Sequence, residues 1–110
     1  MSMPESLFGF QLTAAKIPHT HQFRFHPSRK YRADFRIDGT RLLVEIDGGT
    51  FLTKGGHNGA GFERDRIRDA DAMEQGWVVL HTTPRLVRTG RTLAAVEWLR
   101  QQPYMTRGEE

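Results

Sequence analysis

Residues 31–49 read YRADFRIDGTRLLVEIDGG, and this stretch decides the fold. Apolar residues take every second position of its first part, which is the period of a β-strand. Asp38 and Gly39 then form a strong signal for a hairpin turn. Residues 41–47 follow as a second strand, whose apolar run suggests burial on both faces. The stretch therefore predicts an antiparallel hairpin within a sheet.

The flanking sequence predicts one more strand on the N-terminal side, and a helix, a strand and a helix on the C-terminal side. An alternating run marks a strand at residues 21–26, and a helical period marks a first helix at 5–15. Further along, the expected elements are a charged helix at 62–75, a strand at 77–82 and a helix at 91–101. The candidate buried positions of the charged helix are Phe62, Ile67, Ala70 and Met73. The order is that of an α/β fold, with a mixed four-stranded sheet flanked by helices.

Length and composition bound the class of protein. With 110 residues the chain has room for one compact domain,. We expect a single domain over 1–110, with a core at about 5–102 and a flexible C-terminal tail at 103–110. Cysteine is absent, which excludes disulfides and cysteine-bound zinc and fits the cytoplasm. No apolar run is long enough to span a membrane.

Arginine dominates the basic residues, and the formal net charge is +3. A guanidinium group can donate two parallel hydrogen bonds to a phosphate, so the excess of arginine fits a polyanionic partner. The alternative explanation is a GC-rich genome, which encodes arginine in place of lysine. The candidates for contacts to a DNA backbone lie in three clusters and one loop: Arg24, Arg29, Lys30, Arg32 and Arg36; Arg64 and Arg66; Arg85 and Arg88; and Lys54.

The pair Asp34 and Glu45 is the strongest chemical signal. Asp34 lies inside a strand that otherwise alternates cleanly, and Glu45 interrupts an apolar strand just before the Gly48-Gly49 break. A charge in a central strand is costly unless it is paired or bound to a metal. The two positions lie at comparable distances from the Asp38-Gly39 turn, so the hairpin can place them side by side. Two neighbouring carboxylates with no cysteine nearby favour a hard divalent cation, Mg²⁺ or Mn²⁺.

Two runs carry a family resemblance: RFHPSRKYRADFRIDGTRLLVEIDGG at 24–49 and GGHNGAGFERDRIRDADAMEQGWVVLHTTP at 55–84. They resemble phage and prophage endonuclease-domain proteins of the PD-(D/E)xK, or restriction-endonuclease-like, superfamily. That superfamily includes Holliday junction resolvases and very-short-patch repair endonucleases. The family core is αβββαβ, which matches the order reached above.

The resemblance implies a role for each matching residue. Asp34 and Glu45 would bind the metal, the Ile46 carbonyl would be a further ligand, and Glu5 would join as an outer or second-metal ligand. The superfamily usually has lysine two residues after the glutamate, and here that position is Asp47. Either Asp47 serves as an extra ligand or base, or Arg68 or Lys54 supplies the positive charge.

Two residues near the glycine-rich loop at 48–61 have open roles. His57 is either an ordinary loop histidine or a contact to the scissile phosphate or the attacking water. Asp65 either caps the helix that follows, which is the commoner role, or orients His57.

The resemblance implies a Mg²⁺-dependent DNA endonuclease, structure-selective and of the Holliday junction resolvase type, that acts as a homodimer in recombination or repair. A phage-encoded enzyme of this kind would work in the cytoplasm of the bacterial host. The alternatives are a nicking or repair endonuclease, a catalytically weakened DNA-binding module on the same fold, and a nuclease that acts on RNA.

Overall fold

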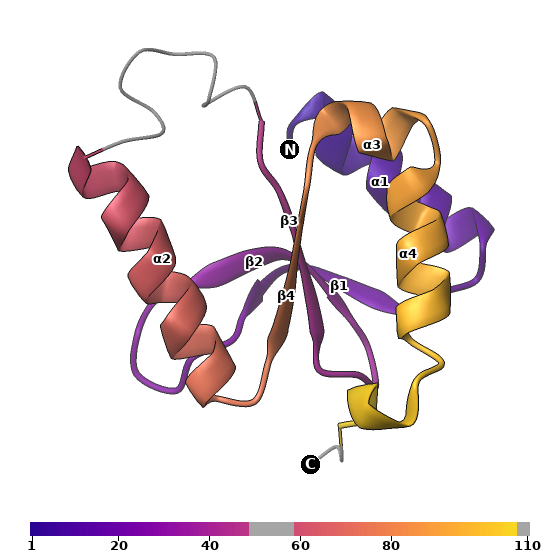
Figure 1. The fold of residues 1–110 in the computed structure, drawn as a ribbon. Coiled ribbons are helices and arrows are strands. Elements are labelled where there is room, and N and C mark those ends of the chain that lie inside the picture. The colour runs from indigo at the N-terminus through magenta and orange to yellow at the C-terminus, as the bar shows by residue number, and fades with distance from the viewer. Residues whose placement is uncertain (49–58, 108–110) are drawn as a thin grey trace.

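The computed structural model describes residues 1–48 and 59–107 (Figure 1). The expected α/β fold is confirmed: four strands form one mixed sheet in the order β1-β2-β3-β4, flanked by helices. The first three strands are antiparallel, and β4 runs parallel to β3. The elements are α1 (Met3–Ala14), β1 (His19–Arg24), β2 (Arg32–Ile37), β3 (Leu42–Ile46), α2 (Gly59–Glu74), β4 (Val78–Thr82), α3 (Pro84–Arg88), α4 (Arg91–Leu99) and η2 (Pro103–Met105).

One face of the sheet is covered by α1, α3 and α4 (Figure 1). Phe8 and Leu12 of α1 pack there against Phe35 of β2, and the rings of Phe8 and Phe35 meet edge to face at 5.3 Å. Val87 and Val96 complete this main core from α3 and α4. Because nearly all of its members are aliphatic or aromatic, this face supplies most of the apolar burial that stabilises the fold.

The opposite face of the sheet is covered by α2, and its core is smaller. It consists of Phe25, Ala33, Leu43, Ala72 and Trp77, of which α2 supplies Ala72 alone. The sequence period had instead suggested the apolar residues of α2 as its buried positions. Those residues point outward: Phe62, Ile67 and Met73 are 46%, 50% and 61% exposed, and Ala70 is exposed as well. The side of α2 that faces the sheet is therefore largely polar.

The first helix begins and ends at recognisable signals. Ser2 and Glu5 form a capping box, in which the Ser2 hydroxyl accepts from the Glu5 N–H and the Glu5 carboxylate accepts from the Ser2 N–H,. At the other end Lys16 has a φ of 59°, a left-handed conformation that lets the Ile17 N–H donate to the Leu12 carbonyl,.

Three expectations about boundaries need correction. The first strand starts at His19, and α2 starts at Gly59, inside the region expected to be a loop. A short helix, α3, follows β4 directly, because Thr83 caps it and proline suits its first position,.

Residues 103–107, expected to be a flexible tail, pack against the fold. Met105 is fully buried in the main core. The guanidinium of Arg41 donates to the carbonyls of Tyr104 and Thr106, which fastens the segment to the start of β3. Among the described helices, none has the length and apolar character that crossing a membrane requires.

Candidate active site

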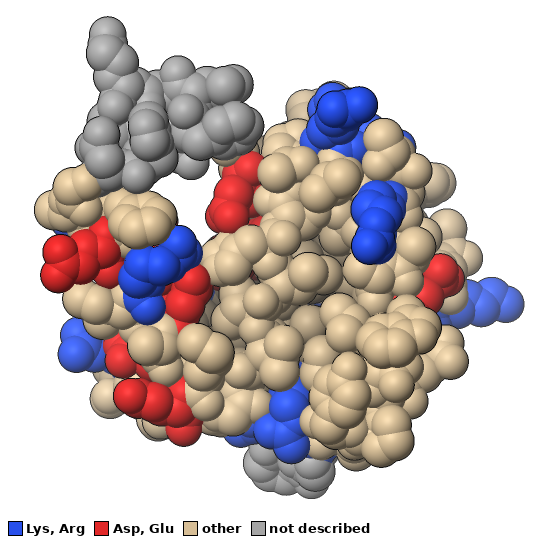
Figure 2. All heavy atoms as spheres, viewed as in Figure 1, with Lys and Arg blue, Asp and Glu red and all other residues tan. Residues whose placement is uncertain are grey.

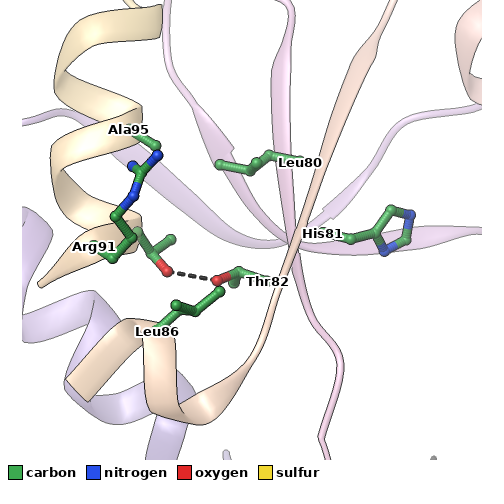
Figure 3. Close-up of a pocket in the computed structure, with 7 residues that line it drawn as sticks. Leu80, His81, Thr82, Leu86, Arg91 and Ala95 are labelled. Atoms are coloured by element: carbon green, nitrogen blue, oxygen red, sulfur yellow. Dashed lines mark hydrogen bonds between the residues drawn. The ribbon is translucent and has the colours of Figure 1, made fainter. Parts of the chain in front are cut away.

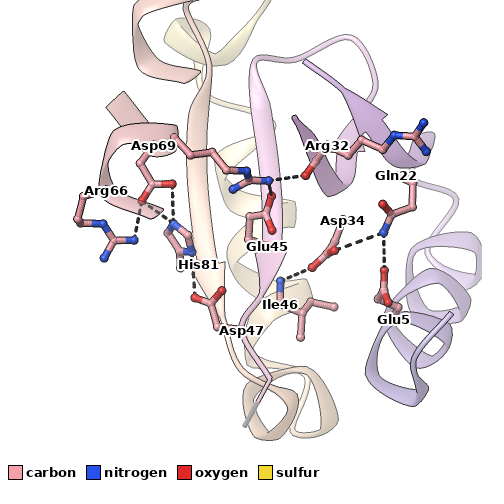
Figure 4. A network of polar contacts seen from close by, with 11 residues as sticks. Glu5, Gln22, Arg32, Asp34, Glu45, Ile46, Asp47, Arg66, Asp69 and His81 are labelled. Atoms are coloured by element: carbon pink, nitrogen blue, oxygen red, sulfur yellow. Dashed lines mark hydrogen bonds and ion pairs between the residues drawn. The ribbon is translucent and has the colours of Figure 1, made fainter. Parts of the chain in front are cut away.

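The hairpin of β2 and β3 brings Asp34 to the end of β3, beside Glu45, whose carboxylate contacts α2. Phe35 pairs with Val44 and Arg36 with Leu43, so the next positions in this register are Asp34 and Glu45. The ladder ends there, and the Ile46 N–H donates to Asp34 Oδ2 at 2.8 Å (Figure 4). That hydrogen bond fixes the Asp34 carboxyl beside the end of β3, next to Glu45.

Burial makes both carboxyl groups reluctant to ionise. It raises the pKa of Glu45 to about 7, and the charge of Asp34 adds to the rise, although the hydrogen bond from Arg68 opposes it. Burial also raises the pKa of Asp34, with contributions from the charges of Glu5 and Asp47, while the Ile46 N–H opposes this rise. Two acids whose charged forms are this unfavourable form a site that a cation would stabilise.

Arg68 of α2 supplies the positive charge at this position. Its guanidinium lies 2.5 Å from Glu45 Oε2 and also donates to the Arg32 carbonyl of β2. The same group lies over the ring of Phe25, 5.2 Å from the centroid. Arg68 therefore connects α2 to both strands that carry the acids.

Glu5 reaches the site from α1 through Gln22. Its Oε1 accepts from Ser2, and its Oε2 lies 3.0 Å from His21 Nε2 and 2.9 Å from Gln22 Nε2. Gln22 Nε2 lies in turn 3.4 Å from Asp34 Oδ1. Burial alone would raise the pKa of Glu5, but the hydrogen bonds from Ser2, His21 and Gln22 outweigh it and lower the pKa to about 2.

Asp47 belongs to a second network on the same face, centred on His81 of β4. His81 pairs with Glu45 in the parallel register of β3 and β4. Its Nδ1 lies 2.9 Å from Asp47 Oδ2 and its Nε2 lies 3.1 Å from Asp69 Oδ2 (Figure 4). Arg66 binds Asp69 at 2.8 Å. The hydrogen bond that His81 donates to Asp47, followed by the charges of both acids, raises the pKa of His81 although burial opposes this, which favours the imidazolium,.

One solved structure shares this architecture. It is the homing endonuclease I-Bth0305I catalytic domain, with a TM-score of 0.62 and 15% sequence identity; the match covers 90% of this chain and 96% of that one. At this identity the likeness establishes the fold alone. No protein-family model and no curated protein matches the sequence.

The donor set fits a hard divalent cation. Asp34, Glu45 and the Ile46 carbonyl offer oxygen ligands only, which suit Mg²⁺ or Mn²⁺ rather than a thiophilic metal. Within residues 1–48 and 59–107, no group of three or more acidic, histidine or cysteine side chains has metal-binding geometry. A cation held here would thus rely on two carboxylates, together with the backbone, water or substrate, as is usual for Mg²⁺.

The structure corrects one expectation about the basic residues. Arg36 is only 8% exposed, and its guanidinium donates to the Thr40 carbonyl and lies over the rings of Phe23 and Trp77. It packs inside the smaller core, so it does not offer a surface contact to DNA. Lys54 and His57 lie outside the described residues.

The other candidates for DNA contacts are exposed: Arg24, Arg29, Lys30, Arg32, Arg64, Arg66, Arg85 and Arg88. They do not form a uniformly positive surface on the face drawn in Figure 2, where acidic and basic side chains alternate along α2. The helix itself has more acidic residues than arginines. Individual arginines beside the site are therefore better candidates for phosphate contacts than a broad basic face.

A pocket of about 210 Å³ lies on the other side of β4, lined by Leu80, Thr82, Leu86 and Thr92 among others (Figure 3). The hydroxyls of Thr82 and Thr92 lie 2.5 Å apart there. The side chain of His81 points away from the other residues, toward the α2 face (Figure 3). None of the described residues that line this pocket is acidic, so it does not offer a second pair of carboxylates like Asp34 and Glu45.

Sequence reasoning missed three members of the site: Gln22, Asp69 and His81. An alternating strand pattern would have placed His81 on the face of Glu45, once β4 was known to lie beside β3. Gln22 gave no signal, because its role depends on a φ of 55°, unusual for a residue other than glycine,.

Proposed function

We propose that this chain is a divalent-metal-dependent endonuclease that hydrolyses phosphodiester bonds in DNA. The observation that carries the proposal is the placement of Asp34 and Glu45, two partly buried acids with raised pKa values, at neighbouring positions of adjacent strands, with Arg68 bound to Glu45. The shared fold with a homing endonuclease catalytic domain supports it.

Asp34, Glu45 and the Ile46 carbonyl would hold the metal, with Glu5 placed to influence it through Gln22. A bound Mg²⁺ would supply Lewis-acid polarisation of a phosphate oxygen and a more acidic water.

The residues of the chain have separate roles in this proposal. The Ile46 N–H orients the Asp34 carboxyl, and Asp34 then presents a fixed oxygen to the site. Arg68 stands in for the missing lysine: its guanidinium can stabilise the charge that grows on a phosphate, although it cannot act as a base,. His81 holds Asp47 and Asp69 beside Glu45 and so fixes the end of β3 against α2.

For the substrate we propose branched DNA, with a four-way junction as the first choice; the second choice is a duplex, cut by a nicking or repair endonuclease. Symmetric cleavage of a junction needs two active sites, so the enzyme would act as a homodimer whose two-fold axis matches that of the junction.

The test is cleavage of a synthetic four-way junction and a linear duplex with Mg²⁺, Mn²⁺ or EDTA. We expect symmetric junction cuts that need the metal and fall by at least about 100-fold in Asp34→Asn and Glu45→Gln, because each removes a proposed metal ligand. Glu97→Gln, a matched change at an exposed position of α4, should cut like the wild type. Metal-independent cutting, or full activity in both site variants, contradicts the proposal.

A second candidate is a DNA-binding module that has lost catalysis. Asp47 at the usual lysine position, together with the ion pair of Arg68 and Glu45, favours this reading, because the pair already neutralises one acid. Metal-independent binding to the junction, with no cleavage under any of these conditions, would establish it.

A further inference from the structure

A pocket of about 500 Å³ opens between α2 and the segment that joins β1 to β2. Its walls are Arg29 and Tyr31 from the segment and Arg64, Asp65, Ile67 and Arg68 from α2. Arg68 is also the residue that binds Glu45, so the pocket adjoins the candidate active site. Its volume lies within the range typical of small-molecule sites, about 300–1,000 Å³.

The charges in the pocket suit a phosphate. Three guanidinium groups and one carboxylate line it. Arg29 and Arg64 are exposed, and neither forms an ion pair with any other residue in the described part of the chain. Two arginines without an acidic partner among the described residues, next to a third that is engaged, form a site where a phosphate can accept forked hydrogen bonds.

The other walls suit a nucleobase. Tyr31 stacks on Phe25 with ring centroids 5.6 Å apart, and its hydroxyl donates to Asp71 at 3.0 Å. The guanidinium groups of Arg29 and Arg68 lie 6.0 and 5.9 Å from its ring centroid, so the ring is held in place beside them. Ile67 adds an apolar surface. Asp65 would repel a phosphate but accepts hydrogen bonds from the amino group of a base. A site for a backbone phosphate alone would need neither the ring nor the acid.

We propose that this pocket binds one unstacked nucleotide of the nucleic-acid strand, with its phosphate on Arg29 and Arg64 and its base against Tyr31 and Asp65. The inference rests on the proposed function for the identity of the polymer, because a nucleotide beside a scissile bond is then the natural occupant. It makes the substrate a strand with an unpaired or displaced base near the cut, as at a branch point or mismatch.

The test is a titration of the full chain with deoxycytidine 5′-monophosphate in metal-free buffer, followed by NMR signals of the arginine side chains and the Tyr31 ring. Deoxycytidine and inorganic phosphate are titrated separately. We expect saturable binding of the nucleotide that shifts Arg29, Arg64 and Tyr31 together. Deoxycytidine, and the nucleotide with the Arg29→Gln/Arg64→Gln variant, should each bind about tenfold more weakly, since charge-assisted hydrogen bonds are lost.

Two further variants sharpen the result. Tyr31→Leu removes the aromatic ring and should weaken the binding of the nucleotide but not that of inorganic phosphate. Lys16→Gln removes one positive charge beyond α1, on the other face of the sheet, and should change the affinity by less than about twofold,. Equal losses in Lys16→Gln and the arginine variant would show unspecific attraction and overturn the proposal.

Binding of phosphate and nucleotide with equal affinity and no shift of Tyr31 would also overturn the inference, because it would show a phosphate site only. Since no metal or cleavage enters the titration, the outcome is separable from that of the proposed function. If the chain binds the nucleotide but does not cut DNA, the nucleotide site is supported and the proposed function fails. If the chain cuts DNA but does not bind the nucleotide, only the nucleotide site is refuted.

Discussion

At the scale of single residues, the acids of this site fall into two kinds. Glu5 is stabilised in its charged form by hydrogen bonds from Ser2, His21 and Gln22. Asp34 and Glu45 are held where their charged forms are costly. The first kind stabilises the folded chain on its own, whereas the second would be stabilised by a bound cation.

Glu5→Gln tests the first kind. A carboxyl whose pKa falls from 4.5 to about 2 on folding adds stability above pH 4.5 and loses it as the pH falls toward 2,. We expect the variant to be less stable than the wild type by about 1 kcal/mol at pH 7, with the difference vanishing near pH 2. Urea unfolding across this range measures it, with Glu97→Gln as the control. A deficit that grows in acid would be the wrong sign.

The sequence revealed Asp34 and Glu45 because a charge in an apolar strand needs a physical reason. Nothing comparable marked Asp69 or His81. Both are common polar residues in positions where solvent exposure is the ordinary outcome, and their partnership exists only once β4 lies beside β3 and α2 covers both. Arg36 was wrongly expected at the surface because it is charged. A guanidinium can be buried when carbonyls and aromatic rings surround it, as they do here.

At the scale of elements, two helices show how local and tertiary requirements differ. The first, α1, follows local rules: a capping box starts it, and a left-handed residue ends it. The second, α2, does not bury its larger apolar residues, because Arg68, Asp69 and the small Ala72 occupy the side that faces the sheet. Apolar periodicity alone therefore predicted that α2 exists, but it did not predict its orientation.

Lys16→Gly tests the end of α1. Lys16 adopts a φ of 59°, which costs a residue with a side chain about 1 kcal/mol and costs glycine nothing,. We expect the variant to raise the free energy of unfolding by about that amount. Lys16→Ala, which keeps a Cβ atom, should give no such gain. Equal stability of the glycine and alanine variants would show that the helix does not end in this conformation.

Ala72→Leu and Met73→Ala test the orientation of α2. Ala72 is 1% exposed against Leu43 and Trp77, so added methyl groups should destabilise the fold by about 2 kcal/mol,. Met73 is 61% exposed, so its truncation should cost less than about 0.5 kcal/mol,. Thermal unfolding of both variants measures which one loses more stability. A larger loss from Met73→Ala would mean that the helix is rotated the other way.

At the scale of the whole molecule, the two faces of the sheet differ in the kind of residues that cover them. The face covered by α1, α3 and α4 carries the larger apolar core, and residues 103–107 help to close it. The face covered by α2 carries the charged groups. The order of the elements along the chain and the hairpin were predictable because period and turn residues are local signals. The packing of the C-terminal segment was not, because it depends on Arg41, distant in sequence.

The central claim is that Asp34 and Glu45 share one divalent cation, and calorimetric titration with Mn²⁺ tests it most directly. Titration at pH 8 keeps Glu45 ionised, since its pKa is about 7. We predict one ion per chain, with affinity more than about tenfold weaker in both Asp34→Asn and Glu45→Gln, and unchanged in Glu97→Gln. Mn²⁺ binding by either site variant with the affinity of the wild type would contradict the claim.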